Sequence, residues 1–401
     1  MKTTRSRWMP WGIVLACALV ALAACGDNNN PSNDTTPNND SPIEDASDND
    51  TGDNEDANDE GDDVDADLPP QEDPPVCDPC SDIEWSDGPA LDLARDHHMT
   101  FISKEGDDAS LVVIGGITEG APPTFIDEVL IAPINPDGTL EPWQQSTPLP
   151  FALAGVPAIQ TPSGLIILIA GRTGQDGQVA LSDKTLVARV TPDGVEGQWT
   201  ESAPLPVSRF HHGGDATDTH IYITGGLDGN DASSSVFVGR LDENGVETWL
   251  QGTPLPLPLT HHSTFIHNKH LYVMGGFTGS LMAPNTQRAV HRALILDNGN
   301  LGPWQVNVGQ LPPIATQANT VYGEHVYVLG GLGPMNFEDQ VLRSELDDQG
   351  PVGFEAMEGS ALPRPIGHTH HAPIHNGFMY FVSGGQRNRL QPDVHIGTLI
   401  P

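Results

Sequence analysis

An apolar segment that ends in two small residues recurs six times along the chain, and this repeat restricts the fold more than any other feature of the sequence. Successive copies end 50 to 55 residues apart, at Gly115-Gly116, Ala170-Gly171, Gly225-Gly226, Gly275-Gly276, Gly330-Gly331 and Gly384-Gly385. Regular self-similarity on this scale is typical of repeat architectures, in which each unit buries its apolar face against its neighbours. The chain is therefore expected to form a set of similar packed units.

Each unit also contains a large aromatic residue that is followed six to eight residues later by Leu; these aromatics are Trp85, Trp143, Trp199, Trp249, Trp304 and Phe354. Turn sequences such as Asn244-Gly245 precede most of them, and Gly supplies the positive φ that tight hairpins need. One complete unit then contains strands at about 261–267, 271–276 and 290–296, with a fourth strand that reaches Trp304. Four-stranded units around an axis form a β-propeller, and the sequence predicts an all-β propeller with six blades.

Two features of these units resemble the Kelch repeat: the Gly-Gly pair that ends the second strand and the Trp of the fourth strand. The resemblance covers residues 82–401 and departs from the Kelch pattern at Ala170 and at Phe354. It implies a six-bladed Kelch-like propeller over residues 77–401, in which the departures affect packing and leave the fold unchanged.

The two ends of this domain are expected to meet. Residues 82–85 form a fourth strand without a blade of its own, and residues 394–400 form the third strand of a last blade that lacks a fourth. Pairing these two segments would remove an exposed strand edge, so we predict that the N-terminal strand closes the propeller.

The first 24 residues have the pattern of a secretory signal peptide, with a basic start and then an apolar run from Trp11 to Ala24. The run ends in Leu22-Ala23-Ala24-Cys25, which resembles the bacterial lipobox. That resemblance implies a diacylated Cys25 that holds the mature protein at a membrane of the cell envelope. Because Gly26, and no aspartate, follows Cys25, an outer-membrane or cell-surface location is favoured.

Residues 25–76 have the composition of a disordered acidic tether. Residues 26–76 contain 18 acidic and no basic side chains, and such a segment cannot bury enough apolar surface to fold. Weak Ca²⁺ association is the one cofactor role that its carboxylates suggest, although no complete calcium-binding loop is present. The whole chain has a formal charge of −37, which argues against a nucleic-acid partner.

Cys77 and Cys80 lie where the tether meets the propeller. In an oxidising compartment, this pair is expected to form a small local disulfide. A redox role is disfavoured because the Cys-x-x-Cys spacing lacks the βαβ setting in which such motifs act.

Histidines form the most distinctive group of candidate site residues. Adjacent pairs open the first strand of four blades, at His97-His98, His211-His212, His261-His262 and His370-His371, with His368 close to the last pair. Blades 2 and 5 have Gly155-Val156 and Gln317-Ala318 there. First strands line the channel of a propeller, so the histidines are expected to gather at one rim. The favoured interpretation is a structural role, in which they bond to the turn of the neighbouring blade. The alternative is a site for a ligand or for Zn²⁺ or Cu²⁺.

Metal–nitrogen bonds are only about 2 Å long, which suggests that one ion can be shared only by adjacent blades. Two clusters are then expected: His97 and His98 with His368, His370 and His371, and His211 and His212 with His261 and His262. Neighbouring residues of a strand point to opposite sides, so at most one member of each strict pair would bind the ion.

The function expected from these features is that of a monomeric, envelope-anchored binding module for a protein or a glycan. No catalytic motif is present and no catalytic residue can be named, so an enzyme is the less favoured class. Two alternatives remain open: a carbohydrate-active enzyme similar to sialic-acid mutarotase propellers, and a metal-binding propeller that uses the histidine rim.

Overall fold

A computed structural model describes residues 75–120, 123–175, 178–281, 283–386 and 389–401, all of which belong to one compact unit. Within these residues, the regular elements are β-strands, as expected for an all-β chain. No helix in this part of the chain is long and apolar enough to cross a membrane. The predicted signal peptide, the lipidated Cys25 and almost all of the acidic tether lie outside the described residues.

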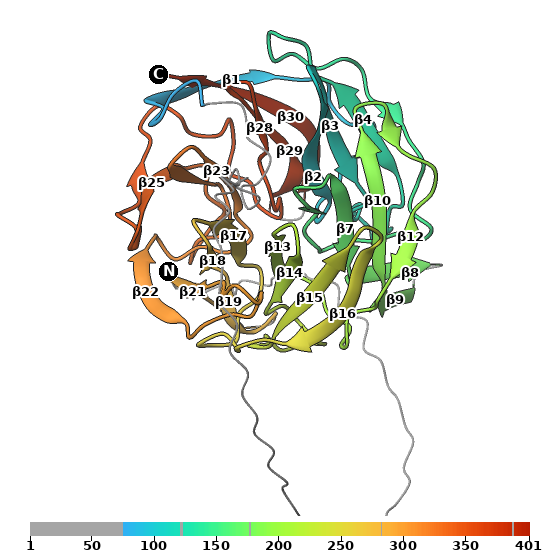
Figure 1. Cartoon of the computed structure of the whole chain (residues 1–401). Helices are drawn as coiled ribbons and strands as arrows, with labels where there is room; N and C mark the ends of the chain where they lie inside the picture. The colour runs from blue at the N-terminus through green and yellow to red at the C-terminus, as the bar shows by residue number, and fades with distance from the viewer. Residues whose placement is uncertain (1–74, 121–122, 176–177, 282, 387–388) are drawn as a thin grey trace, which may run out of the picture. The chain divides into compact units, whose positions relative to one another are not determined.

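Six sheets of four or five strands form the blades of a propeller, and this confirms the predicted fold (Figure 1). Blade 1 contains β2 (Met99–Glu105), β3 (Asp108–Ile114), β4 (Val129–Pro133) and β5 (Gln144–Gln145). Blade 2 contains β6 (Ile159–Gln160), β7 (Leu165–Ile169), β10 (Thr185–Thr191), β11 (Gly194–Val195) and β12 (Thr200–Ser202). Blade 3 contains β13 (Gly213–Ala216), β14 (His220–Thr224), β15 (Val236–Asp242) and β16 (Gly245–Gln251).

The second half of the ring repeats this plan. Blade 4 contains β17 (Ser263–His267), β18 (His270–Met274), β21 (Ala289–Leu294) and β22 (Gln305–Gln310). Blade 5 contains β23 (Ala318–Tyr322), β24 (His325–Leu329), β25 (Val341–Asp347), β26 (Gly350–Pro351) and β27 (Glu355–Ala356). Blade 6 contains β28 (Ile374–His375), β29 (Phe378–Gln386), β30 (Arg389–Ile400) and β1 (Asp82–Asp87). Two small hairpins, β8 (Arg172–Gln175) with β9 (Gln178–Leu181) and β19 (Phe277–Ser280) with β20 (Ala283–Thr286), extend from blades 2 and 4.

The core of the propeller lies between the blades. On β3, Val112 and Ile114 pack against blade 2, whereas Leu111 and Val113 pack against blade 6. Alternate residues of a strand point to opposite faces, so a second strand with a blade on each side must be apolar throughout. This explains why the repeated segments are continuous apolar runs.

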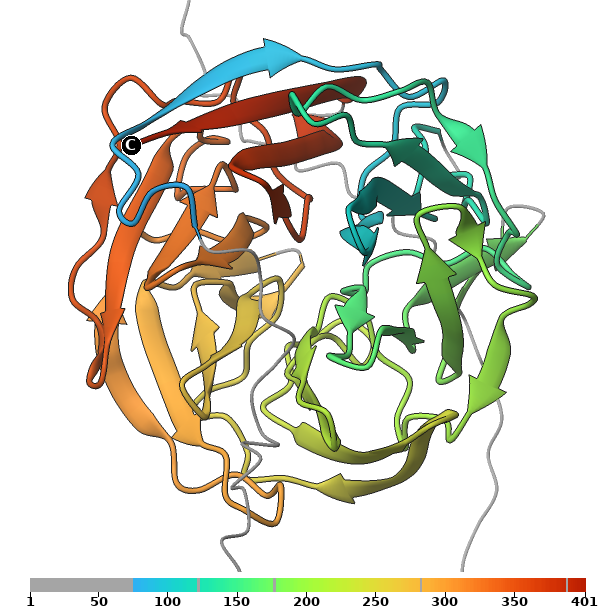
Figure 2. The ribbon, with the colours of Figure 1, turned by 45° about the horizontal axis from the view of Figure 1, so that its top comes forward.

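The strand pairing at the two ends of the domain follows the prediction. β1 pairs antiparallel with β30, from Asp82 opposite Ile400 to Asp87 opposite His395, and is the outer strand of blade 6. Figure 2 shows the blue N-terminal strand beside the dark red C-terminal strands. The Cys77–Cys80 disulfide precedes β1, and the Arg343 guanidinium donates a hydrogen bond to the carbonyl of Cys80. The entry of the chain is thereby joined to blade 5 as well as to blade 6.

The small-residue pairs connect neighbouring blades. The second member donates its N–H to a carbonyl of the next blade, as from Gly116 to Leu153 at 2.9 Å and from Gly384 to Arg95 at 3.1 Å. In blade 6 the pair is therefore Ser383–Gly384, one residue earlier than the predicted Gly384-Gly385. A register shift between Val382 and Gly384 in the pairing of β29 with β30 accounts for this displacement of one residue. The Ser383 hydroxyl also donates a hydrogen bond to the Arg95 carbonyl.

The repeated tryptophans also link blades. In the described residues, five of them donate the indole N–H to a carbonyl of the preceding blade: Trp85 to Ser360, Trp143 to Pro89, Trp199 to Thr147, Trp249 to Ala203 and Trp304 to Thr253. Phe354 packs in the corresponding place of blade 5 but has no N–H to donate. The tryptophans therefore both pack between blades and donate a hydrogen bond to the preceding blade, whereas Phe354 only packs there.

Candidate axial histidine site and central channel

In each blade, one residue of the segment that leads into the first strand lies at the axis of the propeller. These six residues are His97, Gly155, His211, His261, Thr316 and His368. The N–H of each donates to the carbonyl of the equivalent residue in the preceding blade, at 2.7 to 3.0 Å, and the six bonds close into a ring. We call this set the axial ring.

All six residues of the axial ring have a left-handed backbone, with φ between 52° and 74°. Gly155 adopts this conformation without steric cost, whereas a residue with a Cβ loses about 1 kcal/mol or more. Gly155 shows that glycine fits a position of the axial ring, yet the other five positions have residues with side chains. Strained residues of this kind cluster at active sites and ligand clamps.

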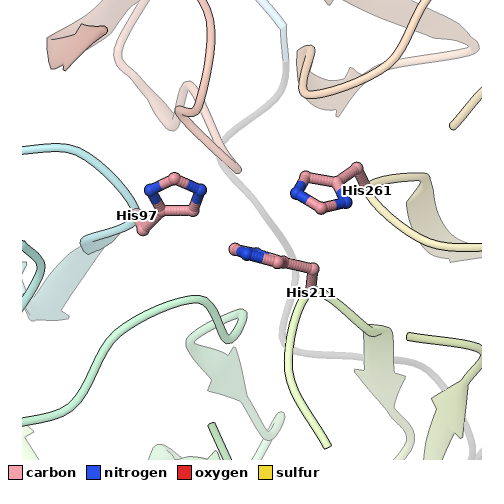
Figure 3. Close-up of side chains that lie close together, drawn as sticks. All are labelled: His97, His211 and His261. Atoms are coloured by element: carbon pink, nitrogen blue, oxygen red, sulfur yellow. The ribbon is translucent and has the colours of Figure 1, made fainter. Parts of the chain in front are cut away.

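The side chains of four axial histidines meet at the centre. Figure 3 draws three of them, His97, His211 and His261. Ring centroids are 3.9 Å apart for His211 and His261, 4.5 Å for His97 and His211, and 4.5 Å for His97 and His368. The expectation that only adjacent blades bring histidines together was therefore wrong, because His97 of blade 1 contacts His211 of blade 3. The reason is Gly155 of blade 2: a Cβ there would lie 2.9 Å from Cε1 of His211.

Blade 6 differs from the expected pairing as well. Its axial residue is His368, and His370 and His371 follow after Thr369, so they are not equivalent to the other pairs. The His370 ring is 6.4 Å from that of His97, and His371 forms a parallel bridge with Asn319 of blade 5. Of the first predicted cluster, His97 and His368 stack on each other, with ring centroids 4.5 Å apart.

The second member of each pair packs between blades and does not join the rings at the centre. Nε2 of His262 is 2.9 Å from the Thr224 hydroxyl of blade 3, and Gln317 donates to the Ser263 hydroxyl in the equivalent place. His98 and His212 lie against Gly116 and Gly226, where an added Cβ would be 3.0 and 2.8 Å from theirs. Among the second histidines, His262 forms a side-chain bond to the neighbouring blade, whereas the ring nitrogens of His98 and His212 have no hydrogen-bond partner in the described residues. The first histidines gather at the axis.

Hydrogen bonds set the tautomers of two axial histidines. Nδ1 of His97 lies 2.8 Å from the Asp96 carboxylate, which also lies 3.5 Å from Nδ1 of His368. The Thr260 hydroxyl donates to the His211 carbonyl at 3.1 Å, so it must accept from Nδ1 of His261 at 3.0 Å. Neutral His97 and His261 then carry the proton on Nδ1 and have an unprotonated Nε2.

Burial favours the neutral form of His97, His211 and His261. Burial is the largest cause and lowers the pKa of His97, although the Asp96 carboxylate opposes it. Burial and the neighbouring imidazoles hold the pKa values of His211 and His261 well below the usual range. Burial opposes the ionisation of Asp96, but contacts with His97 and His368 outweigh it and keep the pKa of Asp96 well below its usual value.

A central channel of about 290 Å³ runs beside the axial ring and is lined by the first strands of the blades. Its polar lining comes from hydroxyl, amide, imidazole and carboxyl groups; it includes Thr100, Gln160, His212, Asp215, His262, Asn319, Thr320, His370 and His371. A smaller cavity of about 20 Å³ borders His97 and His261 and shares His262 and His370 with the channel.

Two acidic residues of the site were not predicted. Asp96 precedes the first histidine pair, and Asp215 lies in β13, where the first strands of blades 1 and 4 have Phe101 and Phe265. The replacement of an aromatic residue by a carboxylate at this position of the repeat is the sequence signal that could have identified Asp215 as a site residue. Burial raises the pKa of Asp215 to about 6, while hydrogen bonds from the N–H groups of Ala216 and Ile266 lower it in part.

No known protein-family model and no curated protein sequence matches this chain.

Proposed function

We propose that the chain is an exported, lipid-anchored propeller of the Kelch type that binds a small polar ligand, such as a glycan or part of one, in its central channel. The fold is compatible with a binding module, and the channel volume of about 290 Å³ is close to the lower end of small-molecule sites. The ligand class is argued from the chemistry of the lining.

The observation that carries this proposal is a set of buried polar atoms that have no hydrogen-bond partner among the described residues and that line the channel together. They are the hydroxyl of Thr100, both ring nitrogens of His212, Nδ1 of His262 and Nε2 of His370. A buried polar atom without a partner costs about 1–3 kcal/mol. A ligand rich in hydroxyl groups can both donate to and accept from such atoms, and this favours a saccharide over an apolar molecule.

The test is titration calorimetry of the full chain, in detergent and with a chelator, against neutral, amino and acidic mono- and disaccharides. One class is expected to bind with a stoichiometry of one. The variants Thr100→Val and His370→Gln should each weaken that binding at least tenfold, because each removes a polar atom of the lining. Leu250→Ala, at a 58 % exposed position of β16, is the control and should bind as the unmodified chain does. The proposal fails if no saccharide binds, or if both channel variants bind like the control.

The anchor is part of the same proposal and rests on Leu22-Ala23-Ala24-Cys25. Acylation of Cys25 would place the channel at the cell envelope, within reach of surface or periplasmic glycans. Cys25→Ser is expected to move the chain from the membrane fraction to an unprocessed or soluble form. Unchanged acylation and sedimentation of this variant would contradict the lipid anchor.

A further inference from the structure

We infer that the axial histidines His97, His211 and His261 bind one transition-metal ion at the centre of the propeller. Each residue offers one ring nitrogen, and the three nitrogens lie within 4.8 Å of one another. All three side chains are buried, and they come from three different blades, so the ion would lie on the axis itself (Figure 3). This site is distinct from the polar lining of the channel and does not depend on the proposed function.

The hydrogen bonds around these histidines leave two ring nitrogens available to bind a cation. Asp96 accepts from Nδ1 of His97, and Thr260 accepts from Nδ1 of His261, so both Nε2 atoms are free to act as ligands. A metal-binding histidine typically donates its other ring N–H to a carboxylate or another oxygen in this way. The Asp96 carboxylate also supplies negative charge, which offsets the nearby guanidinium of Arg172.

His211 provides a second, independent indication. Its Nδ1 is buried and has no hydrogen-bond partner among the described residues, and the residue is only 2 % exposed. The His211 ring lies over Gly155, between His97 and His261, so a cation among the three rings would give this nitrogen a partner.

The geometry indicates an open site. Metal–nitrogen bonds of about 2.0–2.1 Å place ligand nitrogens about 3.5 Å apart, so the three rings would have to rotate slightly toward one another when the ion binds. Three histidine ligands leave a fourth position for water or a ligand, as in catalytic zinc sites. The cavity of about 20 Å³ that borders His97 and His261 has room for one water. Imidazole ligands suit Zn²⁺, Cu²⁺ and Ni²⁺.

The residues that other blades have at equivalent positions suggest matched substitutions for a test. Blade 2 has Gly155 and blade 5 has Thr316 on the axial ring, so His211→Gly and His211→Thr introduce residues that this ring already accommodates. Blade 5 has Gln317 in the position equivalent to His212, so His212→Gln is the control: it changes the adjacent buried histidine, which lines the channel and is not one of the three proposed ligands. Circular dichroism and thermal melting will verify that each variant folds.

The experiment uses the full chain without a polyhistidine tag, stripped with a chelator and then titrated separately with Zn²⁺, Cu²⁺ and Ni²⁺. Calorimetry and elemental analysis should show one bound equivalent of at least one of these ions. Both His211 variants should bind at least 100-fold more weakly, and His212→Gln should bind as tightly as the unmodified chain. Asp96→Asn should weaken binding by about 10- to 100-fold, because the oxygen that orients His97 loses its charge.

Two results would overturn the inference. One is a chain that takes up none of the three ions stoichiometrically. The other is loss of binding in His212→Gln to the same degree as in the His211 variants, which would place the ion in the channel. Saccharide titrations are made with chelator present, so failure of the metal site and failure of the proposed function are seen separately.

Discussion

The two histidines of each pair have different roles although their side chains are identical. His211 has a φ of 52° and lies on the axial ring, whereas His212 follows it and packs against Gly226 between blades. The left-handed residue turns the backbone, and this directs the first imidazole toward the axis and the second toward the neighbouring blade. Each pair of adjacent histidines therefore contains one candidate metal ligand and one residue that packs between blades.

Asp215 gives a pH-dependent prediction at the same scale. Its pKa of about 6 in the folded chain exceeds the usual value of 3.8, so folding favours the protonated form. This contribution to stability is fully present below about pH 4 and is lost as the pH rises through about 6. We expect the unfolding free energy of the unmodified chain, minus that of Asp215→Asn, to fall by about 2 kcal/mol between pH 4 and pH 7.

Urea unfolding of both chains at several pH values, with chelator present, measures this difference. Other titrating groups cancel in the subtraction, including His371, whose pKa burial lowers to about 4. A difference that stays constant with pH would show that Asp215 titrates alike in the folded and unfolded chains.

At the scale of the strand, neighbouring blades are joined by hydrogen bonds as well as by apolar packing. Each tryptophan indole bonds to the segment that follows the outer strand of the preceding blade, and the Leu that follows the aromatic is buried between blades, as Leu205 and Leu255 show. The aromatic-to-Leu spacing of the sequence thus encodes an inter-blade contact. Blade 5 retains the packing with Phe354 and lacks the hydrogen bond.

Trp249→Phe tests the contribution of this bond. It keeps an aromatic ring but leaves the carbonyl of Ala203 without its indole donor, which lies at 3.0 Å. We expect a loss of about 1–3 kcal/mol in the unfolding free energy, measured by urea denaturation. Phe354→Leu, at a blade without this bond, controls for the change of ring packing. If Trp249→Phe cost no stability, the indole bond would be incidental to the packing.

The whole propeller depends on a strand from the opposite end of the sequence. β1 supplies the outer strand of blade 6, and Ile83 on β1 is 1 % exposed in the contact between blades 5 and 6. Without β1, β30 would have an open edge, and a buried apolar contact would be lost. The ring is therefore complete only when both ends of the domain are present.

Two deletions in the full chain separate the tether from the closing strand. Removal of residues 26–74 leaves every described residue in place and should leave the melting temperature nearly unchanged. Removal of 82–87 deletes β1 and should lower the melting temperature by about 10 °C or more, since a buried Ile and a Trp contact are lost with the strand. Equal melting temperatures in differential scanning calorimetry would show that β1 does not support the ring.

The number of blades, the four-strand plan and the pairing of residues 82–85 with the last blade could all be predicted from the sequence. These features depend on local patterns: glycines with positive φ, apolar runs and a spacing of 50 to 55 residues, each of which acts within one unit or between neighbours. The contact between His97 and His211 could not be predicted, because it depends on the absence of a side chain at Gly155 in the blade between them. Only the tertiary structure decided which histidines meet, since the closed ring brings every blade to one axis and the left-handed backbone sends the first imidazole there.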